Sequence, residues 1–72
     1  MSAKSFKMCQ VEIANLSDSA GLANSSLVNT LKAIHEWNWP SAESGLRQFQ
    51  ELLAKMNRLN KDLTRHLEEN DQ

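Results

Sequence analysis

The chain has 72 residues and a net charge of −1, so one small domain is the limit. A core of this size is modest, and such scaffolds commonly need disulfides, a metal or oligomerisation as further support. The only cysteine, Cys9, cannot form an intrachain disulfide, which fits a reducing, cytoplasmic setting. The balanced charge argues against a general nucleic-acid binder. No long apolar run follows the first lysines, so neither a signal peptide nor a membrane span is expected.

The first half of the chain predicts a helix from about residue 3 to about residue 37. Its apolar residues follow a three-four alternation that is typical of a coiled-coil seam: Phe6, Cys9, Ile13, Leu16, Ala20, Ala23 and Leu27. The rhythm then shifts by four to Leu31 and Ile34, which indicates a stutter. Small residues around Gly21 favour a close helix approach there.

Two alternatives stay open for this half. Residues 17–24 are rich in serine, asparagine and glycine, which are poor helix formers, so a break in the helix is possible there. Local alternation over Phe6 to Ile13 could also form a short strand, but that strand would have no partner.

The strongest signal for a turn in the sequence is the segment Glu36-Trp37-Asn38-Trp39-Pro40-Ser41. Proline favours the first turn of a helix and disfavours helical geometry in the residue before it. We therefore expect a turn at 38–40, with either Asn38 or Ser41 as the cap of a second helix.

The second half predicts a helix from about residue 40 to about residue 69, with a frayed end at 70–72. Its apolar stripe recurs at steps of three and four. The stripe consists of Leu46, Phe49, Leu53, Met56, Leu63 and Leu67, with Asn60 in the gap and Leu52 and Leu59 at its margin.

These elements predict an all-α fold, an antiparallel two-helix hairpin that forms a single domain over residues 1–72. Two helices alone bury only one seam, so apolar surface should remain exposed and mark a binding surface. We expect the hairpin to complete a helical bundle with a second copy of itself, the favoured partner, or with helices of another protein. The residues expected to anchor the core and the interface are Phe6, Trp37, Trp39, Phe49, Leu53 and Met56.

The sequence offers little chemistry. The soft metal ligands are Cys9, His35 and His66, and a hairpin places His35 far from the other two. Asp62 and His66, four residues apart, are expected to form a surface pair. No nucleophile–base set, phosphate loop or paired carboxylates are visible. We therefore expect a non-enzymatic protein with no cofactor, no bound metal and no small-molecule substrate: a protein–protein interaction module such as an assembly subunit, chaperone or adaptor.

A second hypothesis concerns Arg58, Lys61 and Arg65, which line one side of the second predicted helix. They could contact nucleic-acid phosphates in a ROP-like dimeric bundle. Acidic residues close by, Asp62, Glu68 and Glu69, favour a solvated charged face instead. The layout is similar to small secretion-apparatus chaperones and small regulatory bundles, but no motif identifies one family.

Overall fold

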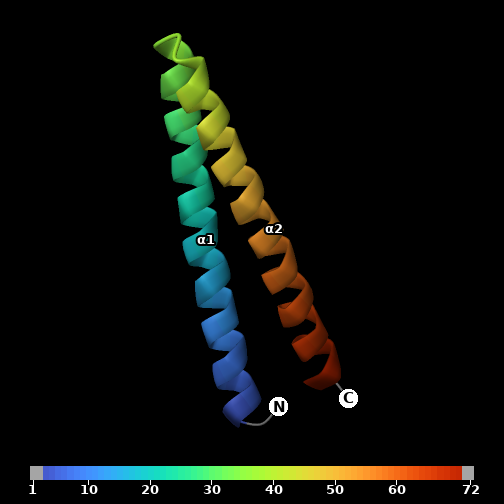
Figure 1. The fold of residues 1–72 in the computed structure, drawn as a ribbon. Coiled ribbons are helices and arrows are strands. Elements are labelled where there is room, and N and C mark those ends of the chain that lie inside the picture. The colour runs from blue at the N-terminus through green and yellow to red at the C-terminus, as the bar shows by residue number, and fades with distance from the viewer. Residues whose placement is uncertain (1–2, 71–72) are drawn as a thin grey trace.

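The protein is an antiparallel helical hairpin in the computed structural model, which describes residues 3–70. Helix α1 runs over Ala3–His35 and helix α2 over Trp39–Asn70. They lie side by side in a rod of 53 × 14 × 12 Å, with both ends of the chain at the end opposite the turn (Figure 1). The predicted all-α hairpin is confirmed. Of the predicted frayed end, residues 71–72 lie outside the described part of the chain.

Helix α1 is continuous, which resolves both alternatives for the first half of the chain. Residues 6–13 are helical, and the helix passes through 17–24 without a break. Ser19 in this stretch is 1% exposed and faces α2. Packing against a neighbouring helix stabilises a helical segment more than its own propensity does, and this outweighs the weak helix formers around Gly21.

The turn closes α1 with a Schellman motif. The Trp37 N–H donates to the Ile34 carbonyl over 3.1 Å, and the Asn38 N–H donates to the Ala33 carbonyl over 2.8 Å. This pattern requires a left-handed residue, and Trp37 has a φ of 59°. Glycine normally occupies that position, since a bulky side chain in the left-handed region is strained. Helix α1 therefore ends at His35, two residues earlier than predicted.

Asn38 begins the second helix as its N-cap. Its side-chain oxygen accepts a hydrogen bond from the Ser41 N–H over 3.3 Å, and its carbonyl accepts one from Ala42 over 3.1 Å. Of the two candidate caps, the structure thus selects Asn38. Pro40 falls in the first turn of α2, where its missing N–H would have no partner in the helix.

The seam of α1 differs from the predicted one. The residues that α2 covers fully or partly are Cys9, Glu12, Leu16, Ser19, Ala23, Ser26, Thr30 and Ala33. These residues recur at steps of three and four without interruption, so the predicted stutter does not occur. Cys9, Leu16 and Ala23 were predicted for the seam, whereas Ile13 and Leu27 are exposed.

Hydroxyl groups explain why polar residues can occupy this seam. The Thr30 hydroxyl donates to the Ser26 carbonyl over 2.8 Å, and the Ser26 hydroxyl donates to the Leu22 carbonyl over 3.1 Å. Each side chain satisfies its polar group within its own helix and can then be buried. A search for apolar residues alone cannot find such a seam.

The seam of α2 changes in size along its length. Near the turn it presents Ala42 and Gly45, and toward the C-terminus it presents Phe49, Leu52, Met56, Leu59, Leu63 and His66. The two ribbons lie closest near the turn and diverge toward the termini (Figure 1). A Cβ atom on Gly45 would collide with the Thr30 hydroxyl and lie 3.3 Å from the Ser26 carbonyl oxygen. The close approach thus depends on Gly45, whereas Gly21 has open space around it.

The two glycines give a matched test of this approach. Gly45→Ala should lower the free energy of unfolding by about 1 kcal/mol, because overpacking against Thr30 outweighs the better helix propensity of alanine. Gly21→Ala should raise it by about 0.5–1 kcal/mol, because an added Cβ atom would lie in open space and alanine has the better helix propensity. Urea unfolding followed by circular dichroism measures both. A Gly45→Ala variant as stable as Gly21→Ala would contradict the close packing.

The turn gives a second prediction. Trp37→Gly and Trp37→Ala both remove the indole, but only glycine relieves the left-handed backbone at this residue. We expect the glycine variant to be more stable than the alanine variant by about 1 kcal/mol in thermal unfolding. The order of these two residues is the reverse inside an ordinary helix. Alanine as the more stable variant would show that the Schellman geometry does not hold at this turn.

Candidate interaction surface

One side of the hairpin carries an uncovered apolar surface, which we call the apolar face. It consists of two columns with a spacing of seven residues: Phe6, Ile13, Ala20, Leu27 and Ile34 in α1, and Trp39, Leu46, Leu53, Asn60 and Leu67 in α2. Asn60 is the only polar member. Apart from Phe6 and Trp39, which begin the columns, each column residue lies four positions after a residue of the seam. Ile13, for example, lies four positions after Cys9, and Leu46 lies four positions after Ala42.

The two columns emerge on the same side because the helices are antiparallel. Viewed from its N-terminus, a right-handed helix turns clockwise as residue numbers rise. Its antiparallel neighbour, viewed from the same end of the rod, turns counterclockwise. In both helices, residues that lie four positions after a seam residue are rotated away from the seam by the same angle. Because the two rotations have opposite senses in this view, these residues lie on the same side of the hairpin. This places Leu27 and Leu46, or Phe6 and Leu67, on one surface.

The apolar face is well exposed. Its eight large apolar side chains are between 41% and 55% exposed. The opposite side of the hairpin carries a different set: Met8, Asn15, Leu22 and Asn29 in α1, Glu36 in the turn, and Ser41, Gln48, Lys55, Asp62 and Glu69 in α2. Only Met8 and Leu22 are apolar there. The contrast between the two sides makes the hairpin amphipathic as a whole, beyond the amphipathicity of each helix.

The predicted anchors divide into three groups. Phe6, Trp39 and Leu53 lie on the apolar face and are exposed. Phe49 and Met56 are half-buried in the seam, where they pack the hairpin itself. Trp37 stands at the turn and is 78% exposed.

The sequence reasoning did not assign Ile13, Leu27, Ile34, Leu46 and Leu67 to one common surface. The pattern that could have indicated this surface is a pair of apolar columns with a spacing of seven residues. This pattern can be separated from the seam only when the seam itself is known.

The two tryptophans form a ring pair at the tip of the rod. The Trp37 and Trp39 centroids are 5.9 Å apart and the ring planes meet at 88°, the edge-to-face geometry that aromatic pairs favour. Trp39 belongs to the apolar face, so the pair extends this face onto the turn. A strained backbone at Trp37 supports two exposed indoles, an arrangement that costs stability and exposes aromatic area at the tip.

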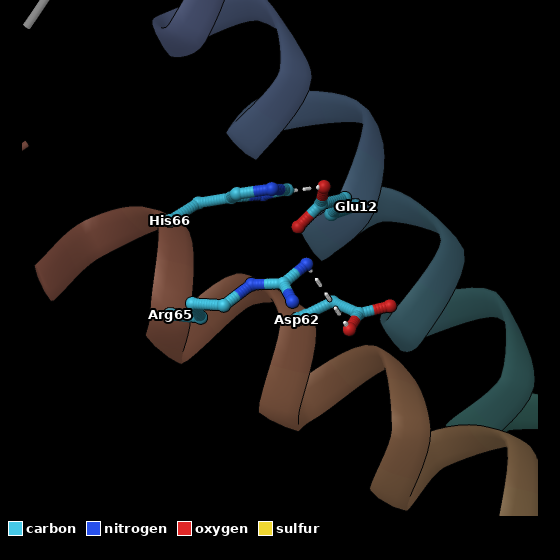
Figure 2. Close-up of polar contacts among 4 residues, drawn as sticks. All are labelled: Glu12, Asp62, Arg65 and His66. Carbon is cyan, nitrogen blue, oxygen red and sulfur yellow. Dashed lines mark ion pairs between the residues drawn. The ribbon is translucent and has the colours of Figure 1, made fainter. Parts of the chain in front are cut away.

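A polar contact crosses the seam near the open end of the hairpin. His66 Nδ1 of α2 lies 2.8 Å from Glu12 Oε1 of α1, and their side chains are 23% and 17% exposed. Figure 2 shows the imidazole directed at this carboxylate and away from Asp62. The predicted Asp62–His66 surface pair is therefore wrong, because the neighbouring helix supplies a closer carboxylate. Asp62 instead pairs with Arg65 at 3.7 Å on the exposed surface.

The structure gives little support for metal binding or nucleic-acid binding. Among the described residues, no group of three histidine, cysteine or acidic side chains is arranged to hold a metal ion. Cys9 is half-buried in the seam. Arg58, Lys61 and Arg65 are exposed, and Arg65 pairs with Asp62, so no observation favours the nucleic-acid hypothesis. Neither described helix combines the length and apolar character needed to cross a membrane.

Comparison with known proteins gives no relative. No protein-family model matches the chain, and no curated protein or solved structure is significantly similar to it. We therefore infer the function of the protein from the geometry of the hairpin.

The Glu12–His66 contact gives a test of helix register. A double-mutant cycle with Glu12→Gln and His66→Gln should give a coupling energy of about 0.5–1 kcal/mol. Asp62→Gln combined with His66→Gln is the matched control and should give no coupling. Coupling of His66 to Asp62 in place of Glu12 would place the helices in a different register.

Proposed function

We propose that this protein is a non-enzymatic protein–protein interaction module, in which the apolar face packs against apolar faces of partner helices. The observation that carries the proposal is the pair of exposed columns beside a filled seam. A helix that faces the core of a four-helix bundle has apolar residues at two seam positions and one flanking position in each seven residues. Both helices of the hairpin have a flanking column of this kind, and both columns point the same way.

The surface area of the hairpin supports this proposal. The protein exposes 5564 Å². A compact folded monomer of its mass, 8.2 kDa, would expose about 4500 Å². The rod therefore leaves about 1000 Å² more in water than a compact chain would. Part of the exposed surface is the apolar face, and a contiguous exposed apolar patch commonly marks a binding site.

Within this function, roles as an assembly subunit, a chaperone or an adaptor share one physical act, which is holding a partner helix against Leu27, Leu46 and Leu53. We place this act in the cytoplasm, where a single unpaired cysteine stays reduced. Trp37 and Trp39 would anchor the tip of the complex, as large aromatic side chains do at the centre of many interfaces.

Site-specific photo-crosslinking tests the proposal. A photoreactive side chain at Ala20 lies on the apolar face, and the same side chain at Asn29 lies on the opposite side of α1. In cells that produce the protein natively, irradiation should give discrete protein adducts from the Ala20 position and at least tenfold fewer from Asn29. The measurement is immunoblotting, followed by mass spectrometry of each adduct.

The matched position makes the outcome decisive. Equal yields at Ala20 and Asn29 would mean that the apolar face has no special role. Absence of adducts at both positions, with the hairpin still helical by circular dichroism, would also overturn the proposal.

A further inference from the structure

We propose that the occupant of the apolar face is a second copy of this chain, bound about a two-fold axis parallel to the rod so that both turns lie at the same end. This inference rests on the proposed function and adds the identity and orientation of the partner. The result is a four-helix bundle in which α1 of each copy stacks on α2 of the other. The observations behind it are the charges beside the apolar face, the position of Asn60 and the exposed area.

A symmetric pair can join its apolar faces in two ways. A two-fold axis along the rod keeps the turns together and stacks α1 on α2. A two-fold axis across the rod places the turns at opposite ends and stacks each helix on its own counterpart. The residues that border the apolar face distinguish these arrangements, since they meet at the rim of the interface.

The border of α2 opposes the opposite-end arrangement. Its charged residues are Glu43, Arg47, Lys61 and Glu68. The middle of α2 lies near residues 54–55, so a cross-rod axis brings Arg47 of one copy beside Lys61 of the other. By symmetry this Arg47–Lys61 pair occurs twice, once at each end of the α2–α2 contact. These like charges disfavour the arrangement, and like-charge juxtaposition is a common device against wrong pairing.

The border of α1 accepts the same-end arrangement. Its polar members are mostly uncharged, namely Gln10, Ser17 and Asn24, with Lys7 near the open end and His35 near the turn. Thr30 lies beside Gly45 and Glu12 beside His66, which sets the levels of the two helices along the rod. At these levels Lys7 of one copy meets Glu68 of the other, an opposite-charge pair. The uncharged residues meet Gln50, Asn57 and Thr64, so no like charges are opposed.

Asn60 gives an independent argument. It is the one polar residue of the apolar face, at about the level of Ile13. The same-end arrangement puts both copies of Asn60 into one layer of the bundle, together with both copies of Ile13. The opposite-end arrangement places each Asn60 against Leu46 and Leu53 of the second copy, where its amide has no polar neighbour. A single asparagine layer is a known device for fixing register and orientation in helical bundles.

The area is also sufficient. A standard interface buries about 800 Å² on each partner. The hairpin exposes 5564 Å², which exceeds the surface of a compact monomer by a similar or larger amount, about 1000 Å². The two columns of the apolar face run from Phe6 and Leu67 at the open end to Ile34 and Trp39 near the turn, so one further rod of the same 53 Å length can cover the face.

Distances between spin labels on the full chain test the proposal. Cysteines are introduced one at a time in a Cys9→Ala background, as His35→Cys near the turn and Gly21→Cys near the middle of the rod. Both positions are exposed and border the apolar face without belonging to it or to the seam. Electron–electron double resonance is recorded on each labelled protein. The same-end dimer predicts about 30 Å at both positions, from two helix diameters and the label arms.

The outcomes separate the two claims. A short distance at Gly21→Cys with about 45–50 Å at His35→Cys, from the helical rise, would show the opposite-end dimer and overturn the proposal. No dipolar coupling at either position would overturn it as well. If the photoreactive side chain at Ala20 then forms adducts with a different protein, the proposed function is still supported. If it forms no adducts, both the proposed function and the dimer are overturned.

A charge on the apolar face provides the control. In the labelled His35→Cys protein, Leu27→Glu should abolish the 30 Å distance, whereas Asn29→Glu on the opposite side should leave it unchanged. Circular dichroism checks that each variant keeps its helical content. Loss of the distance in both variants, or in neither, would show that the apolar face is not the contact between copies.

Discussion

The close approach of the helices at Gly45 is the constraint on which the rest of the structure depends. Thr30 and the Ser26 carbonyl lie where a side chain on residue 45 would be. Two backbones this close leave room only for small residues, so Ser26, Ala33 and Ala42 fill the seam near the turn. Since small residues occupy the seam near the turn, the large apolar residues of this part of α1, such as Leu27 and Ile34, lie outside it.

The fold could be predicted from the sequence more completely than the surface. Proline and asparagine at the turn, with long helical periodicity on both sides, suffice for the hairpin and its bounds within two residues. The seam of α1 could not be predicted, because Ser26 and Thr30 become suitable core residues only when their hydroxyls bond to carbonyls of the same helix. Periodicity of apolar residues therefore identified the exposed column at Ile13 and Leu27 as part of the seam.

The same limit applied to the polar contacts and the turn. His66 was paired with Asp62 because spacing along one helix is visible in a sequence, whereas the neighbouring Glu12 depends on the register of two helices. Trp37 was expected as an anchor, but nothing in its sequence context predicts a left-handed backbone at a tryptophan. Tertiary geometry decided each of these features.

The composition of the seam also bears on how folding and binding are coupled. Hydroxyl and methyl groups near the turn bury little apolar area, so this half of the seam supplies little of the hydrophobic stabilisation that a small domain needs. More apolar area is available on the apolar face, where Leu27, Ile34 and Leu46 remain exposed to water in a single hairpin. Covering that face would add the missing burial to a helix pair whose geometry is already set at Gly45. Association in this protein would thus complete the core of the fold, and its stability would rise with its own concentration.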